Sequence, residues 1–559
     1  MEYDIIFVTG ELFFDHPLCG IAILKRLLEK HGYRVGVIEM PQKDEDVKKL
    51  GKPRLFFGVS SGSIDSMVRN YTPLKKLRKD DKNLDYNESV PDRAVIVYSN
   101  WIKKYFKDSI IVLGGTEASL RRFVHYDYWD NKLRKPVLFD SRANIIAYGS
   151  AEKQILEIAE RIKCQKFSTS LKLVAKSQSQ SDDGKFLSML KNHPDAVNDS
   201  NIPPICDGWF LTSKKPLNGI SGTCIVSTEK PAGFVELPSY EEVLNSKEKF
   251  CDMQNMLSNN RNLAQKIDNR YVLQYKSPKY LPNDLDEYYS LPFTRKVHSK
   301  HLSGFEFSIV THRGCIGGCN FCSLNLMQGD KIISRPEKSI LEEIERITRM
   351  PHFKGNIDDF GGPSANMYGM DCYKCEKDCI ECGKLDRSHN RLVNLLRKAR
   401  AIKGVKHVYV RSGIRYDLVN PKYLEELAKY HISGKLKIAP EHVNKDVLRL
   451  MNKDKGNLNK FISDFKKLGC GKLSFYFMVA HPGSRIEEAR ELAAAIKKLK
   501  NAESVQVFTP TPMTVSTCMY YTGLDPKTKK KVYIPYSYSE KKEQKRAVFG
   551  RLGIKDEDW

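Results

Sequence analysis

The chain has 559 residues, which is long enough for two to four domains. Hydrophobic residues make up 41% and charged residues 29% of it, and no apolar run reaches the roughly 18 residues that a membrane-spanning helix needs. The first residues, MEYDIIFVTGELFFD, lack the basic start and apolar core of a secretory signal. We therefore expect a cytoplasmic globular protein with no membrane partner.

The formal net charge is +24. Such an excess favours polyanionic partners such as RNA, because neutralising phosphates supplies affinity that does not depend on sequence. The alternative is a lysine-rich solvated surface, as in the segment KKLRKDDKN (75–83). No RNP, KH or zinc-finger pattern supports RNA binding, so RNA enters only as a candidate partner.

Residues 1–165 alternate between strand and helix patterns. The apolar run at 3–10 ends at a glycine, and residues 20–33 have apolar side chains at helical spacing. Such strands must be covered on both faces, so we expect a doubly wound parallel α/β domain of Rossmann type. Further strands are expected at YRVGVIEM, RLFFGVS, SIIVLGG and NIIAYGS, and further helices at 92–106 and 151–162.

The rest of the chain divides into three parts. Residues 166–300 are expected to be an insertion and connector, because 164–186 is rich in Ser, Lys and Gln and 276–296 is rich in proline and tyrosine. Residues 301–524 show about six strand–helix units, which predicts a partial parallel barrel of the (β/α)6 type. Residues 525–559 are expected to be a basic tail. The barrel strands are expected at FEFSIVTHRG, GNIDDFGG, HVYVRSG, KLKIAPE, LSFYFMVA and SVQVFTPTP.

Three cysteines, Cys315, Cys319 and Cys322, lie in RGCIGGCNFCSL with the spacing C-x3-C-x2-C. Three thiolates on one short loop can bind three irons of a cubane, and the glycines let the backbone wrap closely around it. The fourth iron would then be open to an exchangeable ligand, as in a catalytic cluster. Zinc is the alternative, but zinc sites usually pair C-x2-C with a distant second pair. The spacing predicts a [4Fe–4S] cluster.

A second group of cysteines follows the second expected barrel strand as C-x2-C-x3-C-x2-C. Four thiolates within eleven residues could form a tetrahedral zinc site or bind an auxiliary iron–sulfur cluster, and free thiols are the third alternative. The spacing predicts a metal site without choosing between these metals. The four residues are Cys372, Cys375, Cys379 and Cys382.

The first cysteine segment, with Phe321 before its last cysteine, resembles the signature of radical S-adenosylmethionine (SAM) proteins. The resemblance implies that the amino and carboxylate groups of SAM chelate the fourth iron and that the backbone at Phe321 meets the adenine. Gly361 and Gly362 resemble a motif that contacts the SAM amino group, although Pro363 stands where the family has an acid.

Two later segments fall in the order that this resemblance requires. Glu441, at the end of the fourth expected barrel strand, would form a hydrogen bond with the ribose of SAM. Gly483, after the fifth strand, lies in a segment that resembles the one bordering the adenine. Both would be cofactor-binding residues.

Longer segments resemble one family within the radical SAM proteins. VTGELFFDHP, LGGTEASLRRFVHYDYWD, DDFGGPSANMYGM and TPTPMTVSTCMYYTG are similar to the YgiQ family, whose substrate is uncharacterised, and the resemblance covers nearly the whole chain. It implies an enzyme that cleaves SAM reductively to start radical chemistry, with an external one-electron donor of the flavodoxin or ferredoxin type. Two alternatives remain, a radical RNA-modifying enzyme and a metal-cluster RNA-binding protein without catalysis.

Three side chains are weaker candidates for catalysis. Arg411 and Arg415, around the end of the third barrel strand, could meet the SAM carboxylate or an anionic substrate. Cys518, near the last strand, could be a hydrogen donor. Structural ion pairs and a buried thiol are the alternative interpretations.

Two features of the amino-terminal domain suggest binding sites, but we do not expect either to be one. His16 directly follows Asp15, so the D-x-H-x-x-G motif of cobalamin-binding domains is not matched, and bound cobalamin is not expected. A charged segment after Gly114-Gly115 could face the barrel, but we expect a surface ion-pair patch instead. Its residues are Glu117, Arg121, Arg122, His125 and Tyr126.

Overall fold

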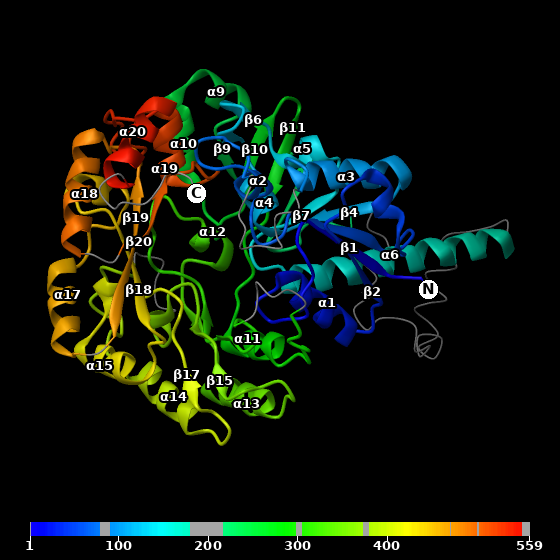
Figure 1. Ribbon diagram of the computed structural model, residues 1–559. Coiled ribbons are helices and arrows are strands. Elements are labelled where there is room, and N and C mark those ends of the chain that lie inside the picture. Colours follow the sequence, from blue (N-terminus) through cyan, green and yellow to red (C-terminus); the bar gives the residue numbers. More distant parts are fainter. Residues whose placement is uncertain are drawn as a thin grey trace.

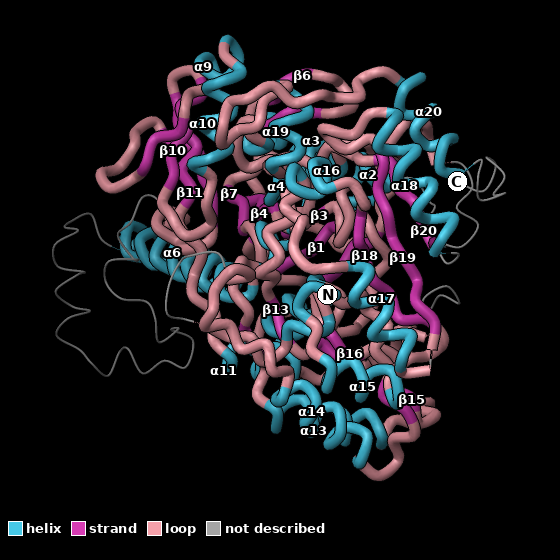
Figure 2. Tube along the Cα trace, turned by 90° about the vertical axis from the view of Figure 1, so that its left-hand side faces the viewer, coloured by secondary structure: helices cyan, strands magenta, loops and turns pink. Residues whose placement is uncertain are grey.

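The structure is a computed structural model in which an amino-terminal sheet and an open barrel lie side by side (Figure 1). Figure 2, turned by 90°, shows α13 and α14 at the end of the molecule opposite α9 and α10. No helix among the described residues is long and apolar enough to cross a membrane. The described residues are 2–78, 90–178, 216–297, 304–372, 379–469, 471–499 and 502–549.

The amino-terminal sheet begins with five parallel strands. Ile5 and Phe7 pack in the core shared with the first and sixth helices, whereas Ile6 and Val8 pack in the core of the opposite face, with the third helix. Both faces are covered, which confirms the doubly wound domain. In spatial order the strands are β2 (Val35–Glu39), β1 (Ile5–Thr9), β3 (Phe56–Ser60), β4 (Ile110–Leu113) and β7 (Ile145–Ala147); the helices are α1 (Gly20–Lys30), α2 (Ser66–Asn70), α3 (Ala94–Tyr105), α4 (Gly115–Leu120), α5 (Val137–Ser141) and α6 (Glu152–Gln178).

The same sheet continues beyond β7 into the segment expected as an insertion. Four more strands widen it to nine, and the first of them runs antiparallel to β7. The part from 223 to 274 therefore builds the sheet, and its two helices pack beside it and against the carboxy-terminal region. These elements are β8 (Thr223–Ser227), β11 (Arg270–Gln274), β10 (Leu263–Ile267), β9 (Val235–Leu237), α9 (Tyr240–Asn245) and α10 (Lys247–Met256).

Six parallel strand segments form the open barrel, as the sequence predicts. β12 pairs with β16, β15 with β17, and β18 with β19 and then β20, while a bridge from Ile414 to Ile438 joins the third segment to the fourth. Strand KLKIAPE was expected where β18 is found. The strands are β12 (Ile309–Val310), β15 (Asn356–Ile357) with β16 (Phe360–Gly361), β17 (His407–Val408), β18 (Lys435–Glu441), β19 (Lys472–Val479) and β20 (Ala502–Val507).

Most helices of the barrel region follow a strand and bury apolar side chains against the barrel core. In α15, Pro421 occupies the first turn and the Asn420 side chain accepts a hydrogen bond from the backbone of Tyr423, so the helix begins where its start signals stand. The helices are α11 (Pro282–Tyr289), α12 (Leu324–Gln328), α13 (Glu337–Thr348), α14 (Asn390–Ala401), α15 (Pro421–Tyr430), α16 (Lys445–Leu450), α17 (Leu458–Lys467), α18 (Ile486–Leu499), α19 (Val515–Thr522) and α20 (Tyr538–Phe549).

The basic tail expected at 525–559 contains a packed helix. α20 lies against α18 and buries Val548 and Phe549 in the barrel core. The Gln544 side chain accepts a hydrogen bond from the backbone of Ala480 and donates one to the carbonyl of Ser484. Part of the tail therefore closes the side of the barrel.

Candidate functional site

Cys315, Cys319 and Cys322 lie on the loop after the first barrel strand, where parallel barrels carry their chemistry. Gly314 has a φ of +88°, and a Cβ there would lie 1.8 Å from the carbonyl oxygen of Lys331. A Cβ on Gly317 would lie 2.5 Å from Nη1 of Arg415 and 3.3 Å from Sγ of Cys315. The glycines are therefore required for the loop to close around its thiols.

Two buried cations flank the three thiols. Nη1 of Arg415 donates to Sγ of Cys319 at 3.4 Å, and its other nitrogens form a two-point ion pair with Asp417 at 3.0 and 2.6 Å. Nζ of Lys453 lies 3.1 Å from Oε1 of Glu441. Burial alone would lower the pKa of Lys453, but Glu441 and Cys319 raise it above its usual value, so the ammonium stays charged. Positive charge here favours thiolate ligands.

This arrangement fits a [4Fe–4S] cluster. No three His, Cys, Asp or Glu side chains in the described ranges are placed to share a metal ion. A cubane does not require that, because each iron takes its own cysteine. Three thiols on one loop, a donor to one sulfur and a second cation nearby would supply the ligands and the charge compensation that such a cluster needs.

The residues expected to bind SAM lie around this loop in two sets. On one side, Lys453 links Glu441 to Phe321, whose ring centroid is 6.0 Å from its Nζ. Leu450, which packs against Gly483, accepts a hydrogen bond from Asn320 of the cysteine loop. On the other side, Gly361 and Gly362 line a cavity together with Ser323 and Leu324 of the same loop.

The three weaker candidates for catalysis lie in different surroundings in the structure. Nη1 of Arg411 donates to the carbonyl of Gly304 at 3.0 Å, and Nε donates to Ser433 at 3.3 Å, so this side chain joins segments of the barrel. Cys518 is fully buried, with Sγ 3.8 Å from Sγ of Cys251 on α10. Of the three candidates, Arg415 is the one that contacts the cysteine loop.

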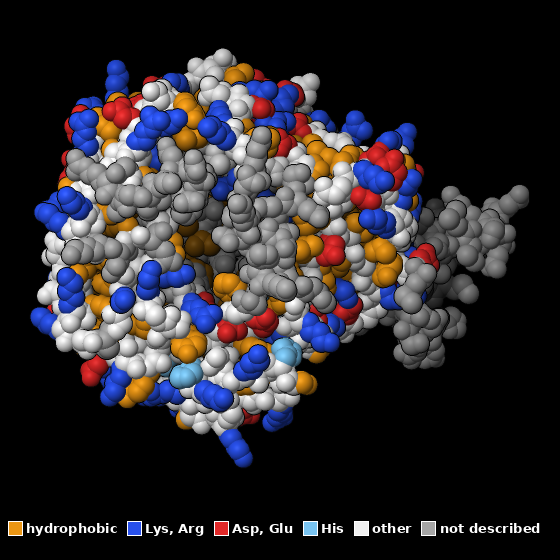
Figure 3. Space-filling model, in the orientation of Figure 1, with side chains coloured by type: hydrophobic (Ala, Val, Ile, Leu, Met, Phe, Trp, Pro, Cys, Tyr) orange, Lys and Arg blue, Asp and Glu red, His pale blue; other side chains and the backbone are white. Residues whose placement is uncertain are grey.

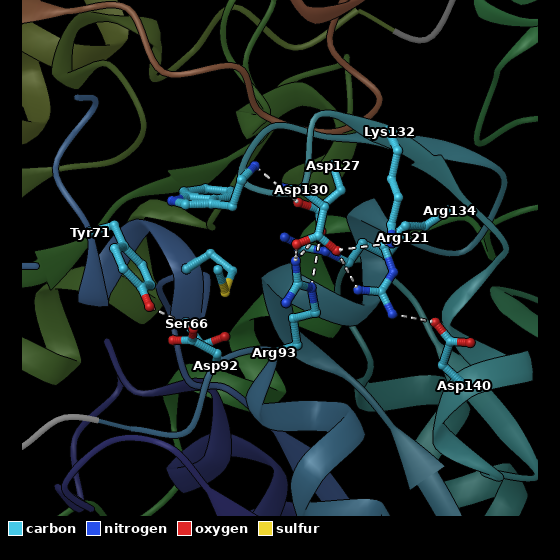
Figure 4. A network of polar contacts seen from close by, with 12 residues as sticks. Ser66, Tyr71, Asp92, Arg93, Arg121, Asp127, Asp130, Lys132, Arg134 and Asp140 are labelled. Atoms are coloured by element: carbon cyan, nitrogen blue, oxygen red, sulfur yellow. Dashed lines mark hydrogen bonds and ion pairs between the residues drawn. The ribbon is translucent and has the colours of Figure 1, made fainter. Parts of the chain in front are cut away.

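The charged segment after Gly114-Gly115 is not the surface patch that we expected. All five of its residues are buried, because the segment folds between the sheet and the carboxy-terminal helices. Arg121 pairs with Asp65. Arg93 binds Asp127 at 2.9 Å and Asp130 at 2.8 Å in the network of Figure 4. The network stabilises the fold of the amino-terminal domain.

Cys379, in the described part of the second cysteine group, lies next to the first cysteine loop. Cys379 packs in one apolar cluster with Ile316, against which Cys315 rests, and its Sγ accepts a hydrogen bond from Nζ of Lys331 at 3.1 Å. Cys372 lines a cavity of about 420 Å³ that residues of α12 also line. Cys375 lies outside the described residues, so the four-thiolate site stays a prediction.

His481 was not singled out from the sequence, although it lies beside the Phe321 ring with centroids 6.3 Å apart. Nδ1 donates to the carbonyl of Pro482 at 2.8 Å, and Nε2 accepts from the hydroxyl of Ser516 at 2.7 Å. Both nitrogens are therefore satisfied in the neutral ring. Burial is the main cause that lowers the pKa of His481 to about 3.

We expect the free energy of unfolding to fall as the pH drops below about 6.5. In that pH range the unfolded chain binds a proton at His481, whereas the folded protein keeps the ring neutral. The loss would be about 1.4 kcal/mol at one pH unit below the usual value. Thermal unfolding of His481→Gln between pH 7 and 5.5 should show a shallower pH dependence than the parent. The exposed His352→Gln is the matched control, and an equal slope in both variants would contradict the assignment.

A larger cavity, of about 550 Å³, lies between the two halves of the molecule. The carboxyl ends of β1, β3, β4 and β7 form one wall, and the first barrel strand with the loops after the second and third strands forms the other. Parallel sheets bind ligands at this edge. The cavity therefore joins the amino-terminal domain to the side of the cysteine loop.

Comparison with known proteins agrees with this geometry. Residues 1–308 match the model of the radical SAM N-terminal domain, 309–496 that of the radical SAM superfamily, and 503–548 a domain of unknown function, DUF3362. A UPF0313 protein of Methanocaldococcus jannaschii is 41% identical over 598 residues, covering 100% of this chain and 90% of its own. One from Fusobacterium nucleatum is 38% identical, covering 98% and 95%.

A solved structure shares the fold. The radical S-adenosylmethionine methyltransferase TsrM of Kitasatospora setae, with tryptophan and a SAM analogue bound, superposes with a TM-score of 0.50 at 13% identity, covering 92% of this chain and 76% of TsrM. This likeness confirms the α/β domain followed by a radical SAM barrel. The full-length relatives decide the family: the chain belongs to the UPF0313, or YgiQ, family of radical SAM proteins.

Proposed function

We propose that this protein is a radical SAM enzyme that cleaves SAM reductively at a [4Fe–4S] cluster bound by Cys315, Cys319 and Cys322. The proposal rests on one observation: a glycine-rich loop at the barrel mouth holds three thiols and contacts the buried guanidinium of Arg415. When bound, cluster and SAM supply the one-electron chemistry that starts hydrogen abstraction. The chain's own work is to hold, orient and shield them.

The residues around the loop have distinct tasks in this proposal. Arg415 donates to a ligand sulfur and is itself fixed by Asp417, so its position is set before the cluster binds. Glu441, paired with Lys453, would accept a hydrogen bond from the ribose. The backbone at Phe321 and the segment at Gly483 would border the adenine. Gly361 and Gly362 would present their backbone to the amino group of SAM.

The proposal includes a second metal site and an electron donor. The second cysteine loop would hold zinc or an auxiliary cluster, and an external one-electron donor would be of flavodoxin or ferredoxin type. For cobalamin, His16 offers no free ring nitrogen, because Nδ1 accepts from the backbone of Leu18 at 3.1 Å and Nε2 lies 2.9 Å from the carbonyl of Glu306. This supports the expectation that cobalamin has no ligand at His16.

RNA remains a second candidate partner because of the net charge of +24. On the face seen in Figure 3, Lys and Arg side chains are scattered over the described surface, with Asp and Glu side chains among them. A dispersed charge of this kind favours a solvated surface over one dedicated RNA groove. A radical enzyme acting on RNA would need turnover that depends on RNA.

The test is anaerobic reconstitution with iron and sulfide, followed by dithionite and SAM. We expect 5′-deoxyadenosine and methionine in equal amounts, measured by chromatography. A protein that carries its full complement of cluster and yields neither product would refute the proposal. Repeating the assay with total RNA separates the candidates, since an RNA-modifying enzyme should form more product, and a binding protein without catalysis none.

A further inference from the structure

The cavity between the two halves of the molecule is acidic, although the chain as a whole is strongly basic. Among the described residues, its lining includes three carboxylates, Glu11, Glu152 and Asp359, and one guanidinium, Arg313. His312 also lines it, and burial lowers its pKa to about 4, so it adds no charge at neutral pH. Apolar side chains from α1 and from β3 and β4 form most of the remaining wall. The lining therefore carries a formal charge of about −2.

Two of the carboxylates are already engaged by the protein. Oε2 of Glu11 accepts from the backbone and the hydroxyl of Ser63 at 2.9 and 2.8 Å. Oδ1 of Asp359 accepts from the backbone of Arg411 and Ser412 at 2.8 and 2.9 Å, and its other oxygen accepts from the Ser412 hydroxyl. These groups fix loops at the rim of the cavity.

Glu152 is different. It is the first residue of α6, is only 4% exposed, and uses Oε1 for an ion pair with Nη2 of Arg313 at 2.7 Å. Its second oxygen, Oε2, is buried and has no donor among the described residues. The hydroxyl of Ser308, 2% exposed and also lining the cavity, has no partner in the same part of the chain.

An unsatisfied buried carboxylate oxygen is costly, and native proteins rarely leave one without a donor. Arg313 gives Oε2 no second bond in the structure, and Nε of that guanidinium donates instead to the hydroxyl of Tyr289 at 3.0 Å. No donor among the described residues reaches Oε2, so a bound ligand could supply one. In a negatively charged cavity, a positively charged donor gains more than a neutral one.

We propose that this cavity binds the part of the substrate that carries a cationic nitrogen, and that Oε2 of Glu152 accepts its hydrogen bond. An ammonium or guanidinium group would pair with Glu152, while an aliphatic or aromatic body would pack on the apolar wall. The inference rests on the proposed function, since it sets the substrate beside Gly361 and Gly362, where the amino group of SAM would lie. It names the substrate class that the proposed function leaves open.

The test uses three probes of one shape: phenethylamine, phenethyl alcohol and phenylacetate. Each is titrated by calorimetry into the anaerobic reconstituted protein saturated with SAM. We expect the amine to bind at least about tenfold more tightly than the other two, a difference of about 1.4 kcal/mol. Equal or tighter binding of the carboxylate would overturn the inference. So would an amine that SAM displaces, because it would then occupy the SAM subsite.

Variants locate the preference. In Glu152→Gln the advantage of the amine should fall below about threefold, whereas Glu157→Gln, further along α6 and paired with Arg161 outside the cavity, should keep it. A preference that survives in Glu152→Gln would show that another group recognises the nitrogen. If Glu152→Gln fails to fold, the relative affinities of the parent protein for the three probes still test whether the cavity prefers a cation.

The two proposals fail separately. Absence of SAM cleavage in the parent protein refutes the enzyme but leaves the probe titration interpretable. Equal affinity for the three probes refutes the cationic substrate but leaves SAM cleavage intact.

Discussion

A Cys315→Ala variant is expected to lose the iron–sulfur absorption of the reconstituted protein and SAM cleavage together. Two thiolates would remain for three irons, so the cluster would not be held. Changes to groups that only support a metal ligand cost about ten- to a hundredfold, so loss of a ligand should reduce cleavage by at least about a hundredfold. The measurements are iron content, visible absorption and 5′-deoxyadenosine formation under anaerobic conditions.

The matched control is Cys19→Ala. Cys19 is a partly exposed thiol before α1, outside both cysteine groups, and its removal should leave iron content and cleavage within about twofold of the parent. Cys315 is on a loop rather than in the core, so without a cluster in either protein the variant should unfold at nearly the parent's temperature. A Cys315→Ala protein that binds a full cluster and cleaves SAM at the parent rate would show that the ligands are elsewhere.

Much of the fold was open to prediction because its elements carry local signals. KLKIAPE alternates buried and exposed side chains as a strand must, and it forms β18 over the expected residues. The third barrel strand was less predictable: of HVYVRSG only His407 and Val408 join the ladder. Beyond them, the backbone of Val410 bonds to His431 on the following loop, a long-range choice that no local pattern reveals.

The site was predictable to the extent that its chemistry lies within one loop. The spacing of Cys315, Cys319 and Cys322 needs no tertiary information. The choice between Arg411 and Arg415 does need tertiary information, because both residues flank the same strand end. Only the packing of the folded chain places the guanidinium of Arg415 against a sulfur. The orphaned oxygen of Glu152 is a property of the assembled cavity, so no sequence pattern could have identified it.

The burial of charged side chains after Gly114-Gly115 was not predicted from the sequence. A segment with Glu117, Arg121 and Arg122 resembles a solvated surface when only composition is considered. In the structure, Arg121 is 2% exposed and its guanidinium contacts Asp65, while the carboxylate of Glu117 accepts from backbone amides of Ser66 and Val95. Charges can be buried there because each finds a partner contributed by a distant part of the chain.

Replacing Arg121 by Met should therefore destabilise the amino-terminal domain by about 3–5 kcal/mol, because Asp65 would remain buried without its countercharge. Burial and Asp65 already raise the pKa of Glu117, and removal of the guanidinium should raise it further. With about 2–4 °C per kcal/mol for a domain of this size, we expect the first thermal unfolding transition to fall by roughly 10 °C. Scanning calorimetry of the parent and the variant measures it.

The partly exposed Arg134, 22% accessible, provides the control, since it pairs with Asp130 and Asp140 at 3.2 and 3.0 Å (Figure 4). Water replaces such partners at little cost, so Arg134→Met should change stability by no more than about 1 kcal/mol. Equal shifts in the two variants would mean that burial does not govern the strength of these pairs. A large loss in Arg121→Met alone would show that the buried guanidinium, and not the surface part of the network, holds Asp65 and Glu117 in the fold.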